Sequence, residues 1–443
     1  MFLKANVAIV KRFISLGVLV VTFLALSMPT ASHALAAASA VTFTVDTTLD
    51  LVGTDLNNAV CPVGSCSLRA AIMHANKIPN VDVTINLPSG LYDLTQLPIG
   101  ADGEESGDLN LTSPTGGNPI INIIGAGAAT TIIDGKGTDR ILTVAINRAA
   151  NISGVTIRNG NRPNLSGGGI YNSGILSITD CVIERNQTGA SGGGILNDGP
   201  LTITRSTIRS NKAYSGGGIY VRNATTIRDS TLSSNGATYG GGIEVSSAAL
   251  PHLLIIVNST LSQNYADTDG GGIDNEGTTF LYNTSIIDND ADHDGNLVPG
   301  GIGGGVNVLT GKRFVVVNSL IARNTVFNQP VYDDCHGNLE SYGWNLLGEL
   351  LGCTFTGNGG SQSIIALDSF GPLQNNGGST QTHALLAGST AIDSTFAQGC
   401  VDENGAALTA DQRGAPRGTG IFCDIGAFEY HPLHYIYLPG IRR

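Results

Sequence analysis

A glycine motif recurs along the middle of the chain at nearly fixed intervals. Gly-Gly-Gly-Ile occurs five times and Gly-Gly-Gly-Val once, beginning at residues 167, 192, 216, 240, 270 and 303. A second motif, an aliphatic residue followed three positions later by asparagine, alternates with it and contains Asn186, Asn211, Asn235, Asn264, Asn289 and Asn324. Such a period is typical of a solenoid, in which each repeat buries its apolar face against its neighbours.

Within each repeat, apolar and polar residues alternate. In "LTITRSTIRSN" (201–211), Leu201, Ile203 and Ile208 are separated by Thr, Arg and Ser. Alternation with period two predicts strands with one buried face, and helical stretches are sparse. We therefore predict an all-β fold, a parallel β-helix whose coils stack about 4.8 Å apart and form hydrogen bonds with the next coil.

A leucine-rich repeat is the alternative fold, because the spacing of Ile203, Ile208 and Asn211 partly fits its pattern. One slot in each repeat, however, holds a small residue that suits a tight β-helix corner: Cys181, Ser206, Ser230, Ser259, Thr284 and Ser319. We expect the equivalent asparagines to stack as a ladder of amide hydrogen bonds. We expect the glycines to form corners with no room for side chains between coils.

Charge and motif content exclude two classes of partner. The formal net charge is −12, whereas a nucleic-acid partner needs a basic face. The glycine runs lead into strands and recur six times, and no Gly-Lys-Ser/Thr phosphate-loop ending is present. We therefore expect no nucleic-acid partner, no nucleotide and no required cofactor.

The first 36 residues have the organisation of an export signal. Lys4, Lys11 and Arg12 accompany an apolar stretch (13–28), and small residues follow in "SHALAAASA" (32–40). A retained membrane anchor is the alternative, because the apolar stretch is near the lower length limit of a bilayer span. We predict cleavage after Ala34 or Ala36 and a secreted or cell-surface bacterial protein.

Seven cysteines suit an oxidising compartment, in which disulfides persist. We expect three local pairs, although sequence leaves their connectivity open: Cys61–Cys66, Cys335–Cys353 and Cys400–Cys423. The seventh, Cys181, occupies the small corner slot, so we predict a buried thiol rather than a nucleophile.

The loss of the period at both ends predicts caps. We expect a signal peptide, an N-terminal cap, coils, a C-terminal disulfide-containing cap at the opposite end and a tail, at residues 1–36, 37–100, 101–345, 346–430 and 431–443. Ser67 is expected to begin a short amphipathic helix (67–77) that covers the first coil. The sequence "HYIYLPGIRR" (434–443) is either a sorting or attachment tag or a frayed last strand.

Several motifs resemble those of exported bacterial β-helix proteins. "CSLRAAIMHAN" (66–76) is similar to the CSLREA motif, with Ala70 in the place of Glu. The repeats resemble those of polymorphic outer-membrane proteins, and residues 121–144 resemble pectate-lyase-like coils. Three further segments resemble the choice-of-anchor Q domain: "LLAGSTAIDS" (385–394), "DQRGAPR" (411–417) and "CDIGAFEY" (423–430). These resemblances imply a surface-associated right-handed β-helix and no particular reaction.

One position directly follows each Gly-Gly-Gly-Ile or Gly-Gly-Gly-Val motif. We predict that its side chain points outward at the same height in every coil. This series is Tyr171, Leu196, Tyr220, Glu244, Asp274 and Asn307. Glu244 and Asp274 are therefore expected to lie roughly 5 Å apart, with Asp269 nearby. Such carboxylates suit a retaining glycosidase, a shared cation or a solvated surface. A polysaccharide lyase would need a basic residue, and none is adjacent to these acids in sequence.

An acidic insertion is a candidate calcium site. Asp290, Asp292 and Asp294 match the first half of a calcium loop, but Gly301 stands where the loop would supply a bidentate Glu. A solvated acidic loop is the alternative.

Three tyrosines form a candidate carbohydrate site. Tyr214 and Tyr239 precede successive glycine runs, and Tyr265 is expected close by. Aromatic faces can hold sugar rings, while coverage of solenoid corners is the alternative. The sequence thus favours a non-enzymatic, adhesin-like or structural protein, with cell-surface polysaccharide or other envelope components as candidate partners. A carbohydrate-active lyase or glycoside hydrolase is the alternative function, and the oligomeric state is left open.

Overall fold

The computed structural model describes residues 41–56, 60–98, 105–113, 118–247, 252–295, 301–327, 333–358, 362–364, 369–395, 399–418 and 422–432. The described residues belong to one compact unit within Ala40–Arg443. The predicted signal peptide and the sequence 434–443 lie outside the described residues. Within those residues, no helix is long and apolar enough to cross a membrane.

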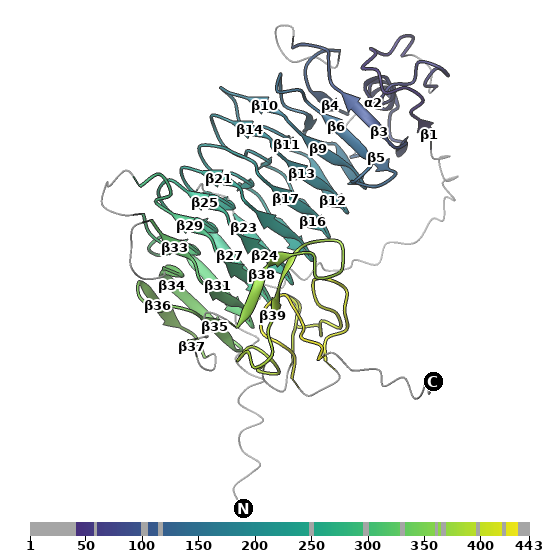
Figure 1. The fold of residues 1–443 in the computed structure, drawn as a ribbon. Coiled ribbons are helices and arrows are strands. Elements are labelled where there is room, and N and C mark those ends of the chain that lie inside the picture. Colours follow the sequence, from purple (N-terminus) through teal and green to yellow (C-terminus); the bar gives the residue numbers. More distant parts are fainter. Residues whose placement is uncertain are drawn as a thin grey trace, which may run out of the picture. The chain divides into compact units, whose positions relative to one another are not determined.

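Short strands build three long parallel sheets (Figure 1). Sheet A contains β1 (Val41–Thr44), β2 (Val83–Leu87), β5 (Ile120–Gly125), β8 (Ala149–Ser153), β12 (Ile175–Thr179), β16 (Leu201–Thr204), β19 (Thr225–Arg228), β23 (Leu253–Val257), β27 (Thr278–Tyr282), β31 (Arg313–Val317), β34 (Cys335–Tyr342) and β36 (Cys353–Thr356). Sheet B contains β3 (Gly90–Asp93), β6 (Thr131–Asp134), β9 (Thr156–Arg158), β13 (Val182–Glu184), β17 (Thr207–Arg209), β20 (Thr231–Ser233), β24 (Thr260–Ser262), β28 (Ser285–Ile287), β32 (Leu320–Ala322), β35 (Asn345–Leu347) and β37 (Gln362–Ile364).

Sheet C contains β4 (Leu109–Leu111), β7 (Leu142–Val144), β11 (Ile170–Asn172), β15 (Ile195–Asn197), β18 (Ile219–Val221), β22 (Ile243–Val245), β26 (Ile273–Asn275) and β30 (Val306–Val308), and it joins sheet A through β34. Two smaller parallel sheets contain β10 (Asn161–Arg162) with β14 (Gln187–Thr188), and β21 (Gly236–Ala237), β25 (Tyr265–Ala266), β29 (Asp290–Ala291) and β33 (Thr325–Val326). The remaining elements are the helix α2 (Leu68–Lys77) and the antiparallel pair β38 (Phe370–Gln374) and β39 (Thr382–Leu385).

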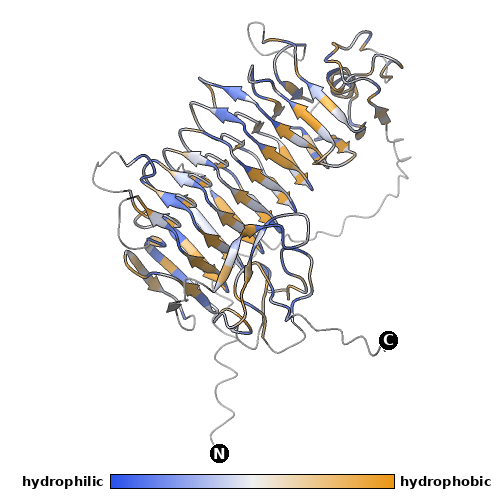
Figure 2. Ribbon diagram, viewed as in Figure 1, coloured by the Kyte–Doolittle hydropathy of each residue, from blue (hydrophilic) through white to orange (hydrophobic). Residues whose placement is uncertain are grey.

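The inward-facing side chains form continuous apolar columns. Ile195, Ile219, Ile243 and Ile273 are register partners on successive coils, and all four are fully buried. Figure 2 shows the corresponding short hydrophobic segments on the stacked strands. Each buried side chain of this size stabilises the fold by roughly 1.5–3 kcal/mol. The parallel β-helix is therefore confirmed, and three long sheets replace the single strand row of a leucine-rich repeat.

The predicted asparagine ladder is present at the corner that follows sheet B. From Asn186 to Asn289, the amide Nδ2 of each ladder residue donates to Oδ1 of the next at 2.9–3.0 Å. The last, Asn324, donates to Oδ1 of Asp334 at 2.8 Å. Burial raises the pKa of Asp334 to about 7. The ladder satisfies amides that would otherwise be buried without partners.

The glycine corners are tight, as predicted. Gly216 has φ of +63°, a conformation that side chains rarely adopt. A Cβ on Gly217 would lie 2.4 Å from the carbonyl oxygen of Gly236 on the next coil. At the small corner slot, the Ser206 backbone N–H donates to Oγ of Ser230 at 3.1 Å. Small residues at both corners therefore allow the coils to stack closely.

The N-terminal helix forms where the sequence predicts it. Ser67 is the N-cap of α2, and its Oγ accepts a hydrogen bond from the Ala70 N–H at 3.0 Å. The helix packs against β2 and β4, with Ile72 and Ala75 in the apolar core. Arg69 is buried and pairs with Asp50 at 2.7 Å. The segment therefore covers the first coils, as expected.

All three predicted disulfides are present: Cys61–Cys66, Cys335–Cys353 and Cys400–Cys423. Cys181 is a buried free thiol whose pKa burial raises to about 11. Because a thiol with such a pKa stays protonated near neutral pH, the prediction that Cys181 is not a nucleophile agrees with its environment.

The C-terminal disulfide-containing region covers a side of the solenoid, which corrects the prediction that it closes the opposite end. It lies beside the outer face of sheet B (Figure 1), where Gln412 bridges Thr260 and Thr231 at 2.6 and 2.9 Å. His383 contacts the Ser262 hydroxyl at 2.9 Å. An apolar cluster joins the two layers and comprises Ile287, Leu320, Ala322, Leu346, Phe370, Leu385, Ala391, Ile425 and Phe428.

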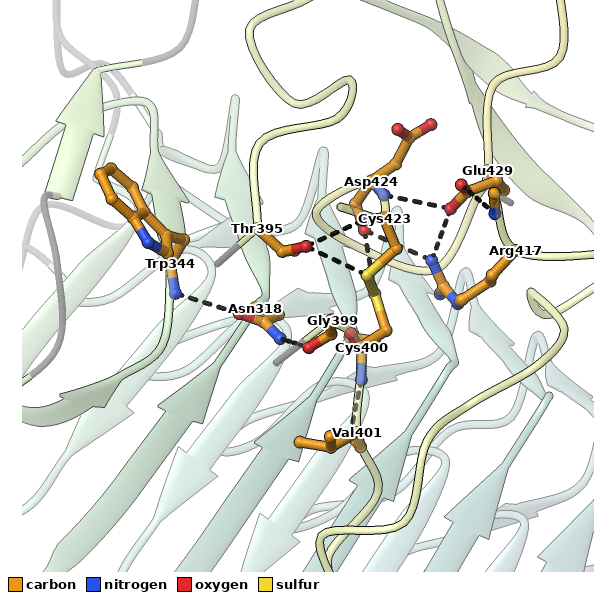
Figure 3. Close-up of a disulfide and its surroundings, with 12 residues drawn as sticks. Asn318, Trp344, Thr395, Gly399, Cys400, Val401, Arg417, Cys423, Asp424 and Glu429 are labelled. Carbon is orange, nitrogen blue, oxygen red and sulfur yellow. Dashed lines mark hydrogen bonds and ion pairs between the residues drawn. A yellow bond between two sulfur atoms is a disulfide. The ribbon is translucent and has the colours of Figure 1, made fainter. Parts of the chain in front are cut away.

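The motifs that resemble an anchor domain pack this region together. Arg417 pairs with Glu429 at 3.1 Å and donates to Oδ1 of Asn258 on the solenoid at 2.6 Å. The Cys400–Cys423 disulfide lies beside this cluster (Figure 3). Coil stacking also extends beyond the predicted range 101–345, because β1 pairs with β2 before it and β35 pairs with β37 after it.

Candidate functional site

The predicted pair of acids lies on adjacent strands of sheet C. Glu244 of β22 is the register partner of Asp274 of β26, which in turn faces Asn307 of β30. Their adjacency is confirmed, but their expected exposure is wrong. Only 6% of Glu244 and 4% of Asp274 are accessible to solvent. Each acid lies between register partners on adjacent coils, with Tyr220 before Glu244 and Asn307 after Asp274.

Burial and mutual repulsion set the protonation of these acids. Burial, followed by the nearby Asp274, Glu276 and Asp269, raises the pKa of Glu244 to about 9. Burial and Asp269 raise the pKa of Asp274 to about 7, although its Oδ1 accepts a hydrogen bond from Nδ2 of Asn307 at 2.9 Å. Glu244 Oε2 has no hydrogen-bond partner among the described residues. Glu244 is therefore predominantly neutral near pH 7.

Asp269 lies close to this pair, as predicted, and holds the following coil. Its Oδ1 accepts a hydrogen bond from the Ile302 N–H at 3.0 Å. Asp333 accepts one from the Gly303 N–H at 3.2 Å. Burial raises the pKa of both carboxyl groups. These acids thus fix the backbone that enters the last Gly-Gly-Gly corner.

The chemistry open to the acid pair is limited by access and charge. A neutral carboxylic acid beside an ionisable one is the arrangement that a retaining glycosidase uses. Every nearby charge that shifts the pKa of Glu244 is another carboxylate, so the site has the wrong sign for a lyase base. The burial of both side chains also restricts contact with a polymer. The arrangement therefore favours a structural role for Glu244 and Asp274.

Two of the three candidate tyrosines come together on an exposed edge. The rings of Tyr214 and Tyr239 meet edge to face, with centroids 5.7 Å apart and planes at 72°. Tyr214 is 53% exposed. Tyr239 and Asp269 occupy equivalent positions on adjacent coils. The N–H of Gly240, the residue after Tyr239, donates to the Asp269 carbonyl oxygen at 3.0 Å. Tyr265 instead places its ring 4.4 Å from that of His293.

The acidic insertion is only partly organised as a cation site. Asp290 forms hydrogen bonds with His293 at 2.8 Å and with Thr325 at 2.7 Å. Burial and the neighbouring acids Asp294 and Asp290 raise the pKa of Asp292. In the part of the chain that the structure describes, no group of three or more His, Cys, Asp or Glu side chains is arranged to hold a metal ion. Calcium binding stays a prediction.

One hollow was missed by the sequence motifs. It has a volume of about 420 Å³ and lies at the corner after sheet B in the first coils, where Lys136, Arg185 and Gln187 line it. No motif marks these residues, and only the distribution of charge along the chain could have pointed to them.

Comparisons with known proteins agree with this architecture. A family model described as a right-handed β-helix region matches residues 194–377. The crystal structure of pectate lyase Pel9A is similar at 14% identity over 89% of this chain and 98% of that chain, with a TM-score of 0.47. No curated protein matches the sequence. The parallel strand register and the family model define a protein of the right-handed parallel β-helix class.

Proposed function

We propose that this protein is an exported, non-enzymatic β-helix that binds polysaccharide through the edge formed by Tyr214 and Tyr239. The observation that favours this function is the contrast between the exposed Tyr214, packed against the partly exposed Tyr239, and the buried acids. Tyr214 is about half exposed, whereas Glu244 and Asp274 are almost completely covered. Aromatic rings can pack against the apolar faces of sugars, and the neighbouring Asp269 and tyrosine hydroxyls can form hydrogen bonds with sugar hydroxyl groups.

Export to the cell surface or the surroundings of a bacterium is part of this proposal. Three disulfides are typical of oxidising compartments, and the first 36 residues resemble a cleaved signal. Mass spectrometry of the protein from its native host should find a mature N-terminus after Ala34 or Ala36. An intact N-terminus beginning at Met1 would contradict export by this route.

A glycan array tests the tyrosine edge. We expect the wild-type protein to retain a subset of glycans, and Tyr214→Ala and Tyr239→Ala to lose that signal. Tyr342→Ala is the matched control, because Tyr342 is 40% exposed on sheet A, away from this edge. Absence of any wild-type signal, or equal loss in the control, would overturn the proposal.

A second candidate function is glycoside hydrolysis at Glu244 and Asp274. It is favoured by the adjacency of the two acids and by the raised pKa of Glu244, which suits a proton donor. On this hypothesis, Glu244→Gln abolishes the release of reducing sugar from a cleaved polysaccharide, while Glu340→Gln on sheet A leaves it intact. Unchanged release by Glu244→Gln would rule out this pair.

A further inference from the structure

The charge of the protein is distributed unevenly along the solenoid. Residues 134–228 contain eleven Lys and Arg and five Asp and Glu, although the whole chain has a formal net charge of −12. These residues form the coils from the end of β6 to β19. These coils therefore have a positive balance on a protein that is otherwise strongly acidic, and such local charge attracts ligands of opposite sign.

The hollow at the corner after sheet B lies in this positive segment. The asparagine ladder starts at Asn186, in the coil of the lining residues Arg185 and Gln187. One coil earlier, Gly160 occupies the corner and its N–H donates to Oδ1 of Asn186 at 2.8 Å. Gly137 lines the hollow one coil before that, and a Cβ at Gly137 would meet no atom within 4 Å. The hollow is therefore open at Gly137, whereas Gly160 is enclosed by Gly168 and Asn186.

Two cations line this hollow, and a third lies on the next coil. Lys136 and Arg185 line it, and their side chains are 49% and 63% exposed. Lys212 is exposed on the next coil, where it pairs by a parallel bridge with the lining residue Gln187. The coil of Lys212 lies three coils beyond that of Lys136, so the two lysines are separated by about 14 Å along the solenoid axis. The cations thus follow the solenoid axis.

The acids near the hollow leave these cations only weakly compensated. Asp134 is held by Arg158 at 2.8 Å, and Glu184 by Arg209 at 2.7 Å. Arg185 lies 3.8 Å from the same Glu184. The Lys136 ammonium lies 3.4 Å from Asp93, in a pair that is open to solvent. Exposed pairs of this kind contribute little, so the cations can exchange them for a ligand.

We propose that this cationic row binds an anionic polysaccharide laid along the solenoid axis. Lys136, Arg185 and Lys212 would bind its carboxylate, sulfate or phosphate groups. The amides of Asn161 and Gln187, which also line the hollow, suit the hydroxyl groups of the sugar rings. A polysaccharide fits better than duplex nucleic acid, because the row offers three cations over about 14 Å, whereas duplex DNA carries a charge about every 1.7 Å. The hollow itself is lined by residues of earlier coils than the tyrosine edge, while Lys212, at the end of the row, lies two residues before Tyr214.

Binding of dextran sulfate, with uncharged dextran as the matched ligand, tests the proposal on the full mature protein. We expect dextran sulfate alone to bind, with an affinity that falls as salt is added. The variant Lys136→Gln/Arg185→Gln/Lys212→Gln should bind dextran sulfate at least about tenfold more weakly, because it loses the charged hydrogen bonds to the sulfate groups. The control Arg222→Gln/Lys312→Gln/Arg313→Gln removes the same charge elsewhere and should keep wild-type affinity.

Each alternative outcome overturns a stated part of the proposal. Equal binding of dextran and dextran sulfate excludes charge recognition. Equal weakening in both triple variants shows a general charge effect in place of a site. Tighter binding of duplex DNA than of dextran sulfate assigns the face to a nucleic acid. Melting curves confirm that both variants fold. The double variant Lys136→Gln/Arg185→Gln, which leaves Lys212 beside Tyr214 intact, should weaken dextran sulfate binding and keep the wild-type glycan-array signal, and this separates the test from that of the tyrosine edge.

Discussion

The two halves of sheet B share one backbone register and differ in what covers them. Along the outward column, register partners run from charged to small or apolar side chains: Arg158, Glu184, Arg209, Ser233, Ser262, Ile287 and Ala322. The change falls where the C-terminal region begins to cover the sheet. In the first half, the column forms ion pairs and faces solvent, whereas in the second half Ser262 and Ile287 are completely buried.

This comparison shows that a solenoid repeat fixes where a side chain points but not whether it is exposed. The strand pairing is equally regular in both halves. Burial in the second half depends on a segment that is more than 100 residues away in sequence, as the contact between Thr260 and Gln412 illustrates. The halves should therefore respond differently to equivalent substitutions.

The largest difference in the loss of unfolding free energy is expected between substitutions of a buried arginine and of a more exposed one. Arg417→Met should destabilise the protein by about 3–5 kcal/mol, because it leaves the buried carboxylate of Glu429 without its partner. Arg158→Met, which breaks the pair with Asp134 on the uncovered half, should cost less, about 1–2 kcal/mol, because Asp134 keeps its hydrogen bonds from Asn159 and from the Lys136 N–H. Urea unfolding at pH 7 measures both values. Equal losses would remove the distinction between the halves.

A smaller difference in the loss of unfolding free energy is expected when apolar side chains of the two halves are truncated to alanine. Ile287→Ala should cost about 2–5 kcal/mol, since it opens a cavity between sheet B and the C-terminal region. Val182→Ala, on the partly exposed β13, should cost about 0.5 kcal/mol. Limited proteolysis should also release the C-terminal region faster from the Ile287 variant. A stable, protease-resistant Ile287→Ala protein would show that the covering layer contributes little.

The acids of the second half should make stability depend on pH. The folded-state pKa values of Glu244 and Asp274, about 9 and about 7, lie above their ordinary values, so folding binds protons. Their stabilising contribution is complete below about pH 4 and is lost as the pH rises through 7 and 9. Urea unfolding at pH 5, 7 and 9 should therefore show a continuous decrease in stability.

Glu244→Gln separates this effect from general acidity. The variant cannot ionise at this position, so its stability should fall less between pH 7 and 9 and exceed that of the wild type at pH 9. Glu340→Gln, at an ion pair with Arg313, is the control and should keep the wild-type slope. Parallel slopes in the wild-type and Glu244→Gln proteins would contradict the assignment.

The smallest effect is expected from metal removal. EDTA should leave the melting temperature unchanged, because Asp290 already forms hydrogen bonds with His293 and Thr325. Differential scanning calorimetry with and without EDTA measures this. A decrease that Asp292→Ala abolishes would instead establish a calcium site in the acidic insertion of the second half.

Much of the fold follows from local sequence. The repeat places Ile219 over Ile243 and Asn211 beside Asn235, because identical spacing in successive coils gives identical register. Ser67 begins the helix where its side chain can cap it, and each disulfide joins cysteines close in sequence. The same spacing brought Glu244 and Asp274 together.

The candidate site was less predictable, because its accessibility depends on packing. A repeat pattern identifies Glu244 as outward-facing, yet Glu244 is buried between Tyr220 and Asp274, its register partners on the adjacent coils. The ring of Tyr265 packs against His293, which belongs to an insertion outside the repeat. The hollow beside Lys136 has no motif of its own, because its lining residues come from three coils that differ in sequence.

The sequence alone determined the coil, its corners, its ladder and its helical cap, since these depend on contacts between equivalent positions of adjacent repeats. Only the tertiary structure decided where the C-terminal region lies and which half of sheet B remains open. That choice rests on long-range contacts, such as those of Arg417 with Asn258 and of His383 with Ser262. The repeat period does not relate these residues. Their contacts depend on the complementarity of the two folded surfaces, so the sequence pattern does not predict them.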